Sequence, residues 1–178
     1  KDGNLPTGIG GDDKAGVFIC LQLLERFNVI KGFFPVAEET GCHGSRGAKE
    51  EFFNNVGYAI QFDSTENDTM SLSLMGTQLF EQDSEFFNKT KGLILEHGFT
   101  EWRHHPYTDT MVLKERFNFS CLNFAAGYYN YHSDNEYVIV EDVLNSTLLG
   151  ESVIKELGNE FYEFMAPKKD SFGWFDNR

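Results

Sequence analysis

Two hydrophobic periods alternate along this chain. Residues 14–27 carry apolar side chains at the three- and four-residue spacing of a helix, and residues 32–37 form a short apolar run typical of a buried strand. The alternation continues, with helices expected over 45–54, 82–97 and 141–164 and a helical turn over 108–115. Strands are expected over 58–62, 102–106 and 119–124, with an edge strand over 70–80. Strands that alternate with helices predict an α/β fold, here a mixed, mostly parallel sheet with helices on both faces.

Length and composition are those of one globular domain. A chain of 178 residues can bury a hydrophobic core, and 40% of its residues are hydrophobic, including 18 Phe. The sequence shows no internal repeat, no low-complexity segment and no linker that would divide it. We therefore expect one domain over residues 1–178.

Charge and cysteine content limit the classes of partner. The formal net charge of −13 argues against a nucleic-acid partner, whose phosphates would need a basic surface. No apolar run approaches the roughly 20 residues of a membrane span, so we expect no membrane partner. The three cysteines, Cys20, Cys42 and Cys121, form no CxxC pair, which favours a reducing, cytoplasmic location. The oligomeric state stays open, with a homo-oligomer as one alternative.

Acidic residues stand at the ends of the expected elements. Asp12 lies just before the first helix, and Glu38 and Glu39 follow the first strand directly. Asp63 follows the second strand, and His132 lies in a loop soon after the last one. Because ligands of open α/β sheets bind outside the carboxyl ends of the strands, we expect these side chains to face one crevice.

Several carboxylates in one crevice repel one another and favour a bound cation. Carboxylates together with an imidazole suit zinc, with manganese or cobalt as substitutes. Asp12, Glu39 and His132 would give zinc three protein ligands and leave one position open for water. Asp63 would begin a second metal site, with Asp12 as the bridging ligand. Since adjacent residues do not easily bind one metal together, Glu38 is left as a general base for that water.

Four segments of the chain are similar to segments of a known group of enzymes. GGDDKAGVFICLQLLE, VAEETGCHGSRGA, IQFDS and GYYNYHSDNEYVIVEDV resemble the co-catalytic zinc exopeptidases, a clan that includes peptidase T, bacterial zinc aminopeptidases and the glutamyl aminopeptidase type. The segments follow the order of the clan and span residues 10–142. The resemblance implies the clan's zinc-exopeptidase-like α/β fold and a metal-dependent hydrolase.

The resemblance also implies roles for individual residues. Asp12 matches the ligand that bridges two zinc ions. Glu39 and His132 match ligands of one ion, and Asp63 matches a ligand of the other. Glu38 matches the general base, and Asp13 matches the residue that follows the bridging aspartate across a cis peptide bond.

The function that follows from the resemblance is an exopeptidase, either an aminopeptidase or a dipeptidase-like enzyme. Such an enzyme hydrolyses a peptide or amino-acid amide substrate with two zinc ions per site, using zinc-activated water and the glutamate base. Two alternatives remain: an amidohydrolase that acts on N-acyl amino acids, and a non-catalytic binding or scaffolding module that retains the fold.

One departure from the clan concerns a further histidine ligand. The clan carries it in an H-x-D motif upstream of the aspartate pair, whereas the eleven residues before Asp12 contain no histidine. We therefore expect residues 1–178 to be a single catalytic domain that lacks its N-terminal portion. If that motif does not exist, the Asp63 metal site would be weakened.

Simple structural roles are the competing interpretation for each site residue. Asp12 or Asp13 could cap the following helix, and the two glutamates could belong to a solvated turn. Asp63 could be an ordinary strand-end residue, and His132 a surface histidine.

Overall fold

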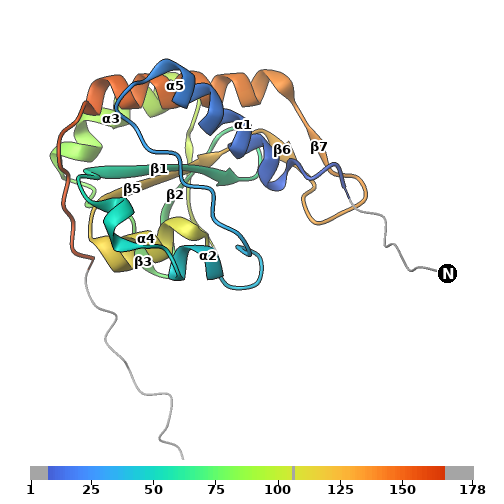
Figure 1. The fold of residues 1–178 in the computed structure, drawn as a ribbon. Coiled ribbons are helices and arrows are strands. Elements are labelled where there is room, and N and C mark those ends of the chain that lie inside the picture. Colours follow the sequence, from blue (N-terminus) through green and yellow to red (C-terminus); the bar gives the residue numbers. More distant parts are fainter. Residues whose placement is uncertain (1–7, 106, 167–178) are drawn as a thin grey trace, which may run out of the picture.

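A five-stranded sheet lies between two layers of helices (Figure 1). The computed structural model describes residues 8–105 and 107–166. The strands of the sheet are β1 (Tyr58–Ser64), β2 (Thr69–Leu74), β3 (Thr77–Gln78), β4 (Glu101–His105) and β5 (Ser120–Ala125). A separate small hairpin is formed by β6 (Tyr128–Tyr129) and β7 (Tyr137–Val138). The helices are α1 (Gly11–Arg26), α2 (His43–Arg46), α3 (Glu85–Glu96), α4 (Asp109–Phe117) and α5 (Val140–Leu157), with a 3-10 helix at Glu50–Phe53.

The sheet is mixed, in the order β1–β5–β2–β3, with β4 paired to β2. Parallel pairing joins β1 to β5 and β2 to β4, whereas β2 pairs antiparallel with β3 and with β5. The predicted mixed α/β sheet is confirmed, but parallel pairings do not outnumber antiparallel ones among the described strands. Every residue of β5 is buried, which fits a strand that has a neighbour on each side and helices on both faces.

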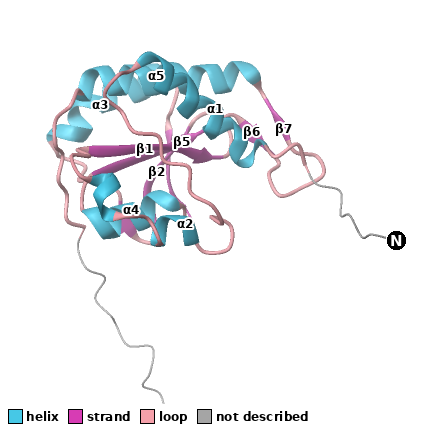
Figure 2. Ribbon diagram, in the orientation of Figure 1, coloured by secondary structure: helices cyan, strands magenta, loops and turns pink. Residues whose placement is uncertain are grey.

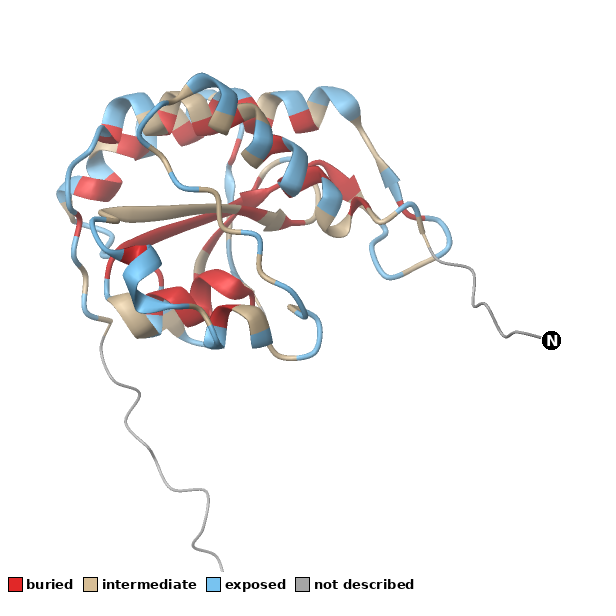
Figure 3. Ribbon diagram, viewed as in Figure 1, coloured by how far each residue is buried: buried red, intermediate tan, exposed pale blue. Residues whose placement is uncertain are grey.

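Helices cover both faces of the sheet, as the sequence predicts. Figure 2 shows α1, α3 and α5 on one side of the strands and α2 and α4 on the other. Buried residues lie in the strands and in the helices of both layers (Figure 3). In α1, Ala15, Ile19 and Leu23 recur every four residues and form the buried stripe of the helix.

Element boundaries differ from the sequence prediction at several places. Residues 32–37 form no strand; Pro35 lacks an N–H group, and the carbonyls of Val36 and Ala37 accept hydrogen bonds from Gly44 and His43. The helix predicted over 45–54 divides into α2 and the 3-10 helix.

Two further predictions about elements are corrected. The edge strand predicted over 70–80 divides into β2, which is internal because it pairs with β3, β4 and β5, and β3, which pairs with β2 and ends the strand order. The closing helix stops at Leu157, since Gly158 takes up a positive φ of 60°. The expected strand over 102–106 ends at His105, and its last position falls outside the described residues. No helix in the described part of the chain is long and apolar enough to span a membrane.

Candidate metal centre

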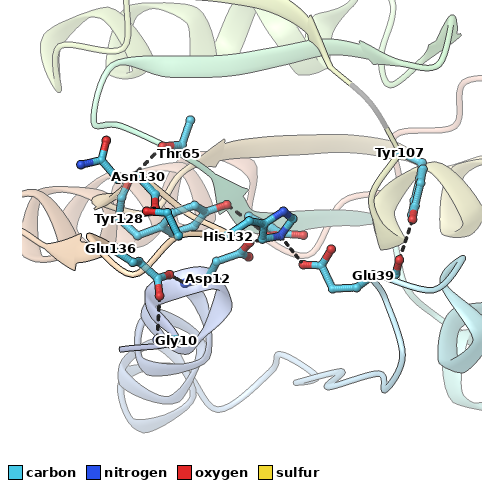
Figure 4. Close-up of polar contacts among 11 residues, drawn as sticks. Gly10, Asp12, Glu39, Thr65, Tyr107, Tyr128, Asn130, His132 and Glu136 are labelled. Carbon is cyan, nitrogen blue, oxygen red and sulfur yellow. Dashed lines mark hydrogen bonds and ion pairs between the residues drawn. The ribbon is translucent and has the colours of Figure 1, made fainter. Parts of the chain in front are cut away.

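Three side chains from distant parts of the sequence meet beside the start of α1. Asp12 lies in the first turn of α1, Glu39 precedes α2, and His132 lies in the loop between β6 and β7. The His132 Nε2 atom is 3.1 Å from Asp12 Oδ2 and 3.1 Å from Glu39 Oε1. Figure 4 shows His132 between the two carboxylates. One potential ligand atom from each residue lies within 4.8 Å of the others, which is the spacing of a candidate metal site.

Glu136 holds the loop that presents Asp12. Its carboxylate accepts hydrogen bonds from the backbone N–H groups of Gly10 and Asp12, each at 2.8 Å (Figure 4). Gly8 permits this approach, because a Cβ atom there would lie 2.2 Å from Glu136 Oε2. Sequence reasoning missed Glu136; its place four residues after His132 within the GYYNYHSDNEY segment was the available signal.

The two adjacent aspartates at the start of α1 have different surroundings. Asp13 Oδ1 accepts a hydrogen bond from the backbone N–H of Gly16 at 2.9 Å, so Asp13 makes the capping contact left open by the sequence. The Asp12 carboxylate instead faces His132. The peptide bond between Asp12 and Asp13 is cis, as the resemblance implies.

The two adjacent glutamates also differ. The backbone carbonyl of Glu39 accepts a hydrogen bond from the Tyr107 hydroxyl at 2.9 Å, and its side chain extends to His132 (Figure 4). Glu38 Oε1 lies 3.8 Å from the Cys42 thiol, which donates to it. Desolvation, with the charges of Glu39 and Asp109, raises the pKa of Glu38 to about 7. A carboxylate with a pKa near neutrality can exchange protons at physiological pH.

Asp63 stands at the end of β1, close to the three residues but outside their group. Gln61 Nε2 donates to Asp63 Oδ2 at 3.0 Å, and the Tyr128 hydroxyl donates to Oδ1 at 3.5 Å. Desolvation raises the pKa of Asp63, and the negative charges of Asp12 and Glu38 raise it further. The structure thus places Asp63 in the same electrostatic neighbourhood as Asp12 but gives it separate supports.

Negative charge accumulates at this centre. Desolvation is the largest cause of a raised pKa at Asp12 and Asp13, and neighbouring carboxylates add to both shifts. The nearest opposing group is His132, whose pKa is raised chiefly by its hydrogen bond to Glu39. Two carboxylates and an imidazole within 4.8 Å match the ligand types of zinc, and a cation would offset the repulsion that raises the carboxyl pKa values. The residues present therefore fit a zinc ion.

No model of a protein family matches the chain, and a search of curated proteins finds no match.

Proposed function

We propose that this chain is the catalytic domain of a metal-dependent exopeptidase. The observation that supports it most is the convergence of Asp12, Glu39 and His132, because Glu39 and His132 are 93 residues apart in sequence and still meet at 3.1 Å. The four segments that resemble the co-catalytic zinc exopeptidases contain all three residues. The three free cysteines favour a reducing compartment, so the proposal includes a cytoplasmic location.

Asp12, Glu39 and His132 would hold one zinc ion, and Asp63 with Asp12 would contribute to a second. When bound, zinc supplies Lewis acidity, polarising a scissile carbonyl and lowering the pKa of water. Manganese or cobalt could take its place, since both accept carboxylate and imidazole ligands.

Glu38 is the proton-transfer group in this proposal. As the free carboxylate next to Glu39, it would accept a proton from the attacking water and then donate that proton to the leaving amine; in the metal-free protein its pKa is about 7. Asp13 has a supporting role. Its carboxylate accepts a hydrogen bond from the Gly16 N–H and so fixes the turn of α1 that follows Asp12. The substrate class is a peptide or an amino-acid amide.

The test is hydrolysis of amino-acid p-nitroanilides and dipeptides by the zinc-loaded protein, with and without a chelator. Glu38→Gln should lower the rate about 10²- to 10⁴-fold while zinc content stays at the wild-type level. Glu51→Gln, an exposed glutamate of the 3-10 helix, is the matched control and should hydrolyse the substrates normally.

Three results would separate the alternatives. Peptide hydrolysis that survives both chelation and Glu38→Gln would overturn the mechanism. Hydrolysis of N-acyl amino acids in place of peptides would make the protein an amidohydrolase. Zinc binding without turnover of either substrate class would favour a binding module.

A further inference from the structure

Gln61 connects the candidate metal centre to the start of α4. It lies on β1 two residues before Asp63, so the two side chains project from the same face of the strand. Its amide nitrogen Nε2 donates a hydrogen bond to Asp63 Oδ2 at 3.0 Å. The side chain is partly buried, as is Asp63.

The orientation of the Gln61 amide is set by the contacts of its oxygen atom. Its oxygen Oε1 accepts hydrogen bonds from the Thr108 hydroxyl at 2.8 Å and from the backbone N–H of Thr110 at 3.0 Å, and the Thr110 hydroxyl also donates to it. Thr108 and Thr110 are themselves buried. Since three donors fix the oxygen, the NH₂ group must face Asp63.

Residues 107–110, at the start of α4, also support the loop that carries Glu38 and Glu39. The Tyr107 hydroxyl donates to the backbone carbonyl of Glu39, and the Ser45 hydroxyl donates to Asp109. Residues 107–110 therefore contact both the chain around Glu39 and, through Gln61, the carboxylate of Asp63. One short segment thus supports both the backbone at Glu39 and, through Gln61, the side chain of Asp63.

We propose that Gln61 is a positioning residue that orients the Asp63 carboxylate for metal binding. This inference rests on the proposed function, which makes Asp63 a ligand. Gln61 donates to Oδ2 of Asp63 at 3.0 Å and Tyr128 donates to Oδ1 at the longer distance of 3.5 Å, so each oxygen keeps one lone pair for the metal, and the shorter bond from the fixed amide orients the carboxylate. Such outer contacts to ligating carboxylates change metal affinity about 10- to 100-fold when removed.

The experiment compares Gln61→Met with wild type by zinc titration of the metal-free protein. Methionine keeps the approximate length of glutamine but donates no hydrogen bond to Asp63. Gln78→Met, at an exposed position on β3, is the matched control. We expect Gln61→Met to bind zinc about 10- to 100-fold more weakly than wild type. The loss should fall on the zinc ion that Asp63 binds, which the Asp63→Asn variant identifies in the same titration. The visible spectrum of the cobalt-substituted protein should change in Gln61→Met and stay unchanged in Gln78→Met.

A second variant covers the case in which Gln61→Met does not fold, which circular dichroism will show. Thr110→Val removes one hydroxyl donor to Gln61 with little change in volume, and should weaken binding of the same zinc ion by about fivefold or less. Zinc isotherms and cobalt spectra identical to wild type in the folded variants would overturn the positioning role. A wild-type protein that binds no zinc would instead overturn the proposed function itself.

Discussion

Two polar clusters lie at the carboxyl ends of β1 and β5, and they are completed in different ways. In the first, Asn123 is fully buried and its amide oxygen accepts a hydrogen bond from the Asp63 backbone N–H. The Asn123 NH₂ group donates to the hydroxyls of Ser64 and Ser71, each at 3.1 Å. Both hydroxyls lie within hydrogen-bond distance of His105 Nδ1. Burial lowers the pKa of His105, which favours the neutral imidazole in this amide network.

The second cluster is the acidic centre around Asp12, Glu38, Glu39 and Asp63. Its groups are mostly acceptors, and burial together with mutual repulsion raises the pKa of three of them. His132, which is positively charged when protonated, is the side chain that pairs with Asp12 and Glu39.

The difference shows what the chain provides for itself. In the amide network, donors and acceptors match, and no buried side-chain N or O atom of the described residues lacks a hydrogen-bond partner. In the acidic centre, negative charge exceeds the positive charge that the chain places there. We infer that the amide network serves stability and that the acidic centre is complementary to a cation from solution.

The largest expected effect comes from removing a shared ligand of the acidic centre. Asp12→Asn should weaken zinc binding by more than about 100-fold. Removing a residue that only hydrogen-bonds to a metal ligand already weakens metal binding by up to about 100-fold, and Asp12 is itself a proposed ligand. The measurement is calorimetric titration of metal-free protein with zinc. Asp83→Asn, an exposed aspartate before α3, should bind zinc as wild type does. Equal affinity in Asp12→Asn and wild type would remove Asp12 from the metal site.

Breaking the amide network should reduce stability more than metal affinity. Asn123→Leu leaves the Asp63 N–H without its buried acceptor and removes the donor to the hydroxyls of Ser64 and Ser71. We expect this to lower the free energy of unfolding by about 3 kcal/mol. Urea unfolding of the metal-free protein measures this cost, with the exposed Asn159→Leu as control. An unchanged midpoint would show that the network contributes no stability.

The smallest effect is a pH dependence of the metal-free protein. The pKa of Glu38 is about 7 in the folded state and about 4.5 when exposed, so the folded state binds more protons between these values. The free energy of unfolding therefore falls as pH rises from 4.5 to 7. The full shift corresponds to about 3 kcal/mol, which solvent screening of this partly exposed side chain reduces to about 1 kcal/mol.

Glu38→Gln should make this part of the stability profile less steep, measured by urea unfolding in chelator at pH 5 and pH 7.5, with the remaining slope due to the raised pKa values of Asp12, Asp13 and Asp63. Glu51→Gln should keep the wild-type slope. Zinc affinity has the opposite trend, rising with pH, because ligands must lose protons to bind metal. A wild-type protein that becomes more stable between pH 5 and 7.5 in chelator would contradict the role given to Glu38.

The sequence predicted the three converging residues better than the elements that present them. Asp12, Glu39 and His132 meet as expected, although residues 32–37 form no strand. Glu39 is placed by a turn in which Gly41 and Cys42 donate backbone hydrogen bonds to the Glu38 carbonyl, a local geometry without a hydrophobic period to reveal it.

The contacts made by the supports of the centre could not be predicted from the sequence, although the segment that carries Glu136 could be singled out. Glu136 acts through the backbone N–H groups of Gly10 and Asp12, and Gln61 acts through an amide whose orientation depends on Thr108 and Thr110. Such contacts join residues whose proximity follows only from tertiary packing. Helix α1 was predictable in type, because its buried stripe is visible as a period in the sequence.

The most direct test of a cation site is diffraction from crystals soaked in zinc, with data collected at the zinc absorption edge. We predict an anomalous peak bounded by Asp12, Glu39 and His132, with oxygen and nitrogen ligands at about 2.0–2.2 Å. No peak between these three side chains at saturating zinc, or zinc bound only elsewhere on the protein, would contradict the account.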